Sequence, residues 1–297
     1  MIDLNLDGQD KKALLEMFNK KGYLLEDKVN EILNNHTSHS AIWSGSLGIE
    51  YQKRNNERVE IDTILKKDMK VFVIDTKRTT YDWFFSPSLN KKNVLFNFIC
   101  LHPKRKYVSV PMNLEDECPI KMVSHDFALG IEEGKLERKN DKKTLVLPRD
   151  GNRPIHDAIR QVLKESKAVL IEGSKYISEY NFIIPMIVTN AKILYMDYEA
   201  KDIEDNGDLI NYKSLTEVGA VGYNFNESFG INTEVGLGSS KIENITKTVI
   251  IVNIHHLKEI VEYLSKLNVS VDFRTDKKSF TSSELKQFDD TRKFWES

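Results

Sequence analysis

Residues 71–77 read Val-Phe-Val-Ile-Asp-Thr-Lys, an apolar run that becomes polar only at its end. Four consecutive apolar residues are typical of a strand that is covered on both faces, and therefore of a strand in the middle of a sheet. Side chains alternate along a strand, so Asp75 and Lys77 are expected on the same face. The sequence thus predicts an acid and a lysine side by side at the end of a central strand.

The segments around this strand alternate between helix and strand patterns. A break is expected near Gly22 in the first helix, and Pro154 is favoured in the first turn of the second. Many glycines and asparagines make 201–247 a loop-rich segment. The expected helices are 10–35, 154–167 and 255–267, and the expected strands are 41–51, 58–65, 71–77, 182–188, 193–198 and 248–253.

The composition is that of a soluble globular protein. Of the 297 residues, 40% are hydrophobic and 30% are charged, and no apolar run approaches the roughly 18 residues of a membrane span. The first residues lack the pattern of a signal peptide, and two cysteines are too few for a disulfide framework, so we expect a cytoplasmic protein without membrane contact. The net charge of −2 excludes a bulk polycation but not a nucleic-acid enzyme with a local basic groove.

A second acid is expected beside the first. Asp62 lies on the strand that precedes 71–77, and a hairpin brings such strands together. Two carboxylates at short distance repel each other unless a cation lies between them, and a hard divalent ion, Mg²⁺ or Mn²⁺, is the usual partner of oxygen ligands. Glu60 lies two residues before Asp62 on the same strand face, so it is an alternative or supporting ligand.

This set of side chains suits phosphodiester hydrolysis. The metal would polarise the scissile phosphate and lower the pKa of a bound water. Lys77 would orient or deprotonate that water, or neutralise charge in the transition state. The alternative is that Asp75 and Lys77 form only a surface ion pair at a strand end.

The chain resembles the restriction-endonuclease-like, or PD-(D/E)XK, phosphodiesterase superfamily. The resemblance rests on a helix with Glu26, a hairpin strand with Asp62, a strand with Asp75-Thr76-Lys77, and the later helix and strand. It implies that Asp62, Asp75 and Lys77 are catalytic, and that Glu26 joins Asp62 and Asp75 in binding the metal. Ile61 stands where many members have proline, and Asp75 replaces the commoner glutamate.

The resemblance also implies the fold class, an α/β fold with a mixed central β-sheet flanked by helices. We expect one nuclease domain over 1–297, because 182–198 and 248–267 are patterned as extensions of one sheet. Its expected parts are a core at 10–80 and 154–198, an insertion at 80–153, a C-terminal extension at 199–270 and a loose tail at 271–297.

Four further residues carry weaker predictions. Glu26 falls at the edge of the apolar arc of its helix, where it would either bind the metal or cap a loop amide. His156 and Arg160 lie one turn apart on the second helix, and they would either reach the site or a phosphate, or be ordinary solvated side chains. Gln161 is expected to face solvent.

The expected activity is metal-dependent endonuclease cleavage of DNA, in restriction or phage defence. Two alternatives remain: a nuclease acting on RNA or branched DNA in repair or turnover, and a non-catalytic nucleic-acid-binding subunit of a larger complex. The partner is nucleic acid, with DNA favoured, and the resemblance leaves open a homodimer or a partner ATPase or helicase subunit.

Overall fold

The fold is described from a computed structural model. It describes residues 12, 15, 23–36, 41–48, 58–67, 70–79, 81–87, 96–101, 107–112, 118–131, 145–146, 154–172, 182–225 and 247–267. The chain divides into two compact units, Met1–Lys266 and Leu267–Ser297, and the second contributes only Leu267 to these residues. Most of the first half of the expected helix at 10–35 and the expected tail at 271–297 therefore lie outside the described residues.

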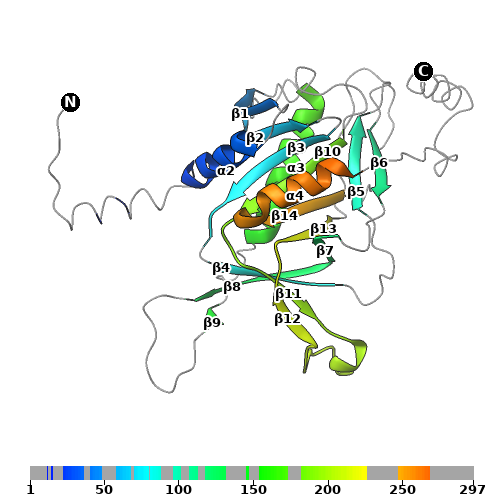
Figure 1. Ribbon diagram of the computed structural model, residues 1–297. Coiled ribbons are helices and arrows are strands. Elements are labelled where there is room, and N and C mark those ends of the chain that lie inside the picture. The colour runs from blue at the N-terminus through cyan, green and yellow to red at the C-terminus, as the bar shows by residue number, and fades with distance from the viewer. Residues whose placement is uncertain are drawn as a thin grey trace, which may run out of the picture. The chain divides into compact units, whose positions relative to one another are not determined.

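A mixed sheet of nine strands forms the larger part of the described fold (Figure 1). Seven strands follow the order β1-β2-β3-β10-β14-β13-β7, and β5 pairs with β10 and with β6. The parallel trio β3-β10-β14 lies inside the sheet, with antiparallel neighbours on both sides. The strands are β1 (Ala41–Gly48), β2 (Arg58–Lys67), β3 (Lys70–Lys77), β5 (Phe96–Leu101), β6 (Tyr107–Met112), β7 (Ile120–Val123), β10 (Phe182–Thr189), β13 (Ala220–Phe225) and β14 (Lys247–Asn253).

The strand β3 occupies the central position that its sequence predicts. It pairs parallel with β10 along its whole length, from Lys70 opposite Phe182 to Lys77 opposite Thr189. Its first part, Lys70 to Ile74, also pairs antiparallel with β2. The side chains of 71–74 are completely buried. The unbroken apolar run is therefore explained by cover on both faces of the sheet.

Helices cover the two faces of this sheet. They are α2 (Tyr23–His36), α3 (Pro154–Glu172) and α4 (Leu257–Lys266), the last preceded by a short 3₁₀ turn, Ile254–His256. The helix α3 packs against β3 and β10, while α2 and α4 contact each other and lie across the sheet from α3 (Figure 1). This is the expected mixed α/β arrangement, a central sheet flanked by helices. None of the helices in the described part is long and apolar enough to cross a membrane.

The core between α3 and the sheet is a continuous apolar cluster. Residues of α3 at helical spacing meet every second residue of the adjacent strands, as the two periodicities require. Its members include Ile155, Ala158, Ile159, Val162, Leu163, Ile187, Val221, Val249 and Ile251.

A second sheet corrects one expectation from the sequence. The segment expected at 193–198 does not extend the main sheet, because β11 pairs parallel with β4 through Ile193 and Trp83. Segment 80–153 supplies strands to both sheets. The second sheet has the order β12-β11-β4-β8-β9, with β4 (Tyr81–Ser86), β8 (His125–Ile131), β9 (Leu145–Val146), β11 (Ile193–Asp197) and β12 (Ser214–Glu217).

The described part of the segment expected to be loop-rich, 201–225, contains the strands β12 and β13, and a short 3₁₀ turn, Ala200–Asp202, lies at its start. One of the strands, β13, lies inside the main sheet between β14 and β7. Gly222 of β13 is not a turn glycine: a Cβ atom added there would overlap the ring of Phe96 and the sulfur of Met122. Glycine marks a close approach at this position, which single-sequence patterns read as a loop.

Candidate active site

Asp62 lies at an irregularity in the strand pairing. Between the pairs Trp43–Ile64 and Gly45–Ile61 the register shifts, so two residues of β2, Asp62 and Thr63, face one residue of β1. Such a bulge bends a strand and changes the direction of its side chains. A strand interruption therefore sets the orientation of the first acid.

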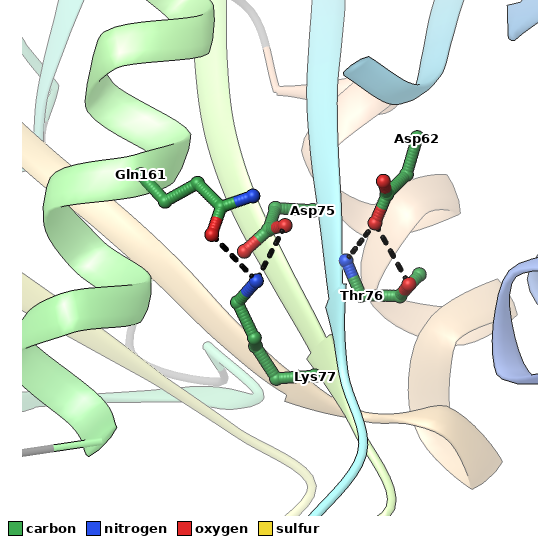
Figure 2. Close-up of polar contacts among 5 residues, drawn as sticks. All are labelled: Asp62, Asp75, Thr76, Lys77 and Gln161. Atoms are coloured by element: carbon green, nitrogen blue, oxygen red, sulfur yellow. Dashed lines mark hydrogen bonds and ion pairs between the residues drawn. The ribbon is translucent and has the colours of Figure 1, made fainter. Parts of the chain in front are cut away.

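The carboxylate of Asp62 binds the residue that separates Asp75 from Lys77. Its Oδ2 accepts hydrogen bonds from the backbone N–H of Thr76 at 2.7 Å and from Thr76 Oγ1 at 2.8 Å (Figure 2). The regular β2–β3 pairing ends at Thr63 opposite Ile74, so the Asp62 side chain takes over the role of a backbone partner. This fixes Asp62 against the end of β3.

Asp75 and Lys77 project from the same face of β3, as strand alternation predicts. Lys77 Nζ lies 3.0 Å from Asp75 Oδ1 in an ion pair. The Asp75 side chain is completely buried, whereas that of Lys77 is 28% exposed. In the parallel register Asp75 is opposite Ile187, a member of the cluster under α3, so its carboxylate lies on the α3 side of the sheet.

Gln161 contacts this pair from α3. Its Oε1 accepts a hydrogen bond from Lys77 Nζ at 2.8 Å, and Figure 2 shows Gln161 and Asp62 reaching β3 from opposite sides. The residue is exposed, as expected, but its amide is not free in solvent. Lys77 is thus held between an acid of its own strand and an amide of the helix.

Burial dominates the electrostatics of Asp75. It raises the pKa of this carboxyl to about 7; the charge and the hydrogen bond of Lys77 oppose the rise, and the charges of Asp62 and Glu26 add to it. Asp75 Oδ2 is buried and has no hydrogen-bond partner among the described residues. One oxygen of Asp75 is therefore paired, and the other is available.

Glu165 is a site residue that sequence reasoning missed. It lies one turn beyond Gln161 on α3, its side chain is completely buried, and neither carboxyl oxygen has a hydrogen-bond partner within the described part of the chain. Burial, followed by the charges of Asp75 and Asp62, raises the pKa of Glu165 to about 9. The Gln161 amide lies close enough to oppose this rise without reaching hydrogen-bond geometry.

A sequence signal for Glu165 existed. Counting four residues on from Gln161 and three on from Val162 places an acid on the apolar face of α3. An acid on a buried helical face is rarely there for packing alone, because burying a carboxyl without a partner is costly.

Glu26 approaches the same group of acids from α2. The helix is anchored on β2 one turn further on, where Asn30 Oδ1 accepts a hydrogen bond from Thr63 Oγ1 at 2.8 Å. Partial burial, and then the charges of Asp62 and Glu60, raise the pKa of Glu26, while Lys77 opposes the rise. Glu26 is therefore in the field of the site, and Glu60, which is exposed, lies at its outer edge.

The two remaining candidates on α3 are placed differently. The His156 ring packs edge-on against Tyr223 of β13, with ring centroids 6.2 Å apart. Because β13 is three strands away from β3 in the sheet, this contact directs His156 away from Asp75. Arg160 is exposed, and Gln161, not Arg160, makes the α3 contact with Lys77.

The donor set fits a divalent cation that also uses water and substrate as ligands. In the described ranges no group of three or more His, Cys, Asp or Glu side chains forms a complete protein cage for a metal. Mg²⁺ is usually held by one or two carboxylates, with waters and phosphate oxygens completing its shell. The unpaired, buried Oδ2 of Asp75 is a hard oxygen donor of this kind.

No protein-family model, curated protein or solved structure matches the chain. The chemistry of the site must therefore be argued from its own side chains.

Proposed function

We propose that this protein is a divalent-metal-dependent endonuclease that hydrolyses DNA phosphodiester bonds. The observation that carries the proposal is the buried Asp75 carboxylate, paired on one oxygen with Lys77 and unpaired on the other, at the end of a central strand. The order of acids and lysine resembles the restriction-endonuclease-like superfamily, and we propose membership of it on that basis. A role in restriction or phage defence would follow from this membership.

The arrangement of charge favours an enzyme over a binding subunit. A surface that only binds nucleic-acid phosphates needs positively charged side chains, because a cluster of carboxylates repels the phosphates. Here Asp62, Asp75 and Glu26 influence one another electrostatically, and Lys77 pairs with Asp75 among them. A cluster of carboxylates in a phosphate-binding site is explained when a metal ion lies between the carboxylates and the substrate phosphate and offsets their repulsion.

Lys77 is the residue that meets the substrate. An ammonium group has three hydrogens; Asp75 and Gln161 accept two, which leaves one for a phosphate oxygen or a water. The partly exposed Lys77 Nζ would donate to the oxygen on which negative charge grows. Fixed acceptors on two sides restrict the rotation of Lys77 before the substrate arrives.

The carboxylates act as ligands and as fixed charges. Asp62, held by both Thr76 donors, keeps one oxygen for a ligand role, and Asp75 keeps Oδ2. A Mg²⁺ or Mn²⁺ ion bound there supplies Lewis-acid polarisation of the phosphate and acidifies water. Asp75 also stabilises the Lys77 charge through their ion pair.

The test compares cleavage of supercoiled plasmid, linear duplex, single-stranded DNA and RNA with Mg²⁺, Mn²⁺ or EDTA. Asp75→Asn and Lys77→Met are the test variants, because both keep the side-chain size. Asp157→Asn on the exposed face of α3 and Lys192→Met are matched controls. We expect the test variants to lose at least about 100-fold in rate and the controls to cut like wild type.

The substrate decides between the enzymatic alternatives. Cutting of plasmid and duplex DNA supports the DNA endonuclease, while cutting of RNA alone transfers the same chemistry to the RNA alternative. Equal cutting with EDTA, or by Asp75→Asn, would overturn the proposal. Tight binding of nucleic acid without any cleavage would favour the binding-subunit alternative.

A further inference from the structure

Glu165 is a buried acid that the roles assigned above do not use. It lies one turn beyond Gln161 on α3, on the helical face that meets β3. Its side chain has no solvent exposure, and neither Oε atom has a hydrogen-bond partner in the described residues. Buried carboxyl groups in folded proteins are nearly always paired, so two unpaired oxygens call for a partner.

The other side of the same space also holds an unpaired oxygen. Asp75 Oδ2 is buried and without a partner in the described part, while Oδ1 is occupied by Lys77. After burial itself, the Asp75 charge is the largest contribution that raises the pKa of Glu165. Gln161, one turn from Glu165, contacts Lys77, and Asp75 faces α3 beside Ile187, so the two carboxyl groups lie at the same junction of α3 and β3. Together they carry three unpaired oxygens.

A bound cation satisfies this group better than protons do. A single proton on Glu165 removes the repulsion and could join one Glu165 oxygen to Asp75 Oδ2, but it leaves the other Glu165 oxygen without a partner. A divalent ion accepts all three oxygens as ligands and balances both negative charges. Oxygen ligands select a hard ion such as Mg²⁺ or Mn²⁺, and two carboxylates plus water form a common shell for it.

We propose that Glu165 is a metal ligand, and that a divalent cation binds between its carboxylate and Oδ2 of Asp75 on the α3 side of β3. The inference rests on the proposed function, whose metal site it deepens by assigning a ligand from the helix. Asp62 is the weaker ligand, because its Oδ2 already accepts two hydrogen bonds from Thr76. The exposed Gln161 and the partly exposed Lys77 mark the side from which the ion enters.

The test is Mn²⁺ binding to the full chain without nucleic acid. Isothermal titration calorimetry gives the affinity, and the electron paramagnetic resonance signal of free Mn²⁺ gives the number of ions bound. We expect Glu165→Gln to weaken Mn²⁺ binding at least tenfold. Asp62→Asn should weaken it less, and the control Asp157→Asn should leave it unchanged.

Two outcomes overturn the inference: wild type that binds no Mn²⁺, or Glu165→Gln that binds Mn²⁺ with wild-type affinity and stoichiometry. Circular dichroism without metal checks that the variant folds. Should Glu165→Gln not fold, Glu165→Asp withdraws the carboxylate by one methylene and is expected to weaken binding; an unchanged affinity would then refute the ligand role.

The failure of this inference can be told apart from the failure of the nuclease proposal. If wild type cuts DNA with Mg²⁺ but Mn²⁺ binding does not depend on Glu165, the nuclease proposal stands and the ligand role of Glu165 is refuted. If Mn²⁺ binding depends on Glu165 but wild type cuts no substrate, the ligand role of Glu165 stands and the nuclease proposal is refuted.

Discussion

The backbone N–H of Thr76 donates a 2.7 Å hydrogen bond to Oδ2 of Asp62, so a side chain of β2 completes the hydrogen bonding of β3 where the regular pairing has ended. The same carboxylate also accepts from Thr76 Oγ1. Thr76 lies between Asp75 and Lys77 in the sequence, and any movement of its backbone moves both neighbours. Asp62 therefore has a structural role as well as its proposed chemical one.

Asp62→Asn and Asp62→Ala should separate these two roles. The asparagine oxygen can still accept from Thr76, so we expect its free energy of unfolding to fall by less than about 1 kcal/mol. Alanine leaves the Thr76 donors unpaired and should cost about 1–3 kcal/mol in urea unfolding. Both variants should lose cleavage. Wild-type cleavage by Asp62→Asn would show that Asp62 is only structural.

Lys77→Met should make stability depend more steeply on pH. Without the Lys77 charge, the pKa of Asp75 rises further above its usual value. Below about pH 5, Asp75 is protonated in the folded state of both proteins and ionises alike in their unfolded states, so the variant should match wild type; at pH 8 it should be about 1–3 kcal/mol less stable. Urea unfolding across this range measures the difference. A constant difference at every pH would contradict the ion-pair explanation, and Lys192→Met provides the exposed-lysine control.

Glu165 should make the metal-free protein less stable as pH rises. Its pKa is about 9 in the folded chain against 4.5 as its ordinary value, so between these values the folded state holds a proton that the unfolded state has released. Raising the pH therefore favours unfolding, by up to about 1.4 kcal/mol per pH unit. Glu165→Gln should remove this loss.

The useful range for that measurement is pH 7 to 8.5 in EDTA. Asp75 contributes a loss of the same sign, but chiefly between its ordinary value of 3.8 and about 7. Above pH 7 the difference between wild type and Glu165→Gln thus isolates Glu165. If the urea midpoints of wild type and Glu165→Gln change equally with pH over this range, Glu165 ionises at its ordinary pKa and the prediction is wrong.

Local periodicity was sufficient to predict the centre of the fold. Burial on both faces of β3 follows from Val71 to Ile74, and the Asp75–Lys77 pair follows from strand alternation. The apolar stripe of α4 was equally readable, since Leu257, Ile260, Val261 and Leu264 are all buried. In both cases the spacing of apolar residues within one short segment is sufficient to predict which side chains are buried.

Contacts between distant segments were not readable in this way. Ile193 pairs with Trp83, 110 residues earlier, and nothing in either segment selects the second sheet over the first. The bulge at Asp62 depends on its partner strand, and Gly222 stands in a strand at a place where Phe96 leaves no room for a side chain. Glu165 differs from these contacts, because helical periodicity alone places its side chain on the buried face of α3.

Gln161 should position Lys77 without contributing much to stability. It is exposed, and it accepts a 2.8 Å hydrogen bond from Lys77 Nζ, so Gln161→Ala should change the free energy of unfolding by less than about 1 kcal/mol. Cleavage should nevertheless fall roughly 10- to 100-fold, because Lys77 then samples other rotamers. Gln161→Glu keeps an acceptor at the same distance and should restore the position of Lys77, while substrate binding stays weaker than in wild type, since the added charge repels phosphate. Cleavage by Gln161→Ala at the wild-type rate would show that Asp75 alone is sufficient to hold Lys77 in place.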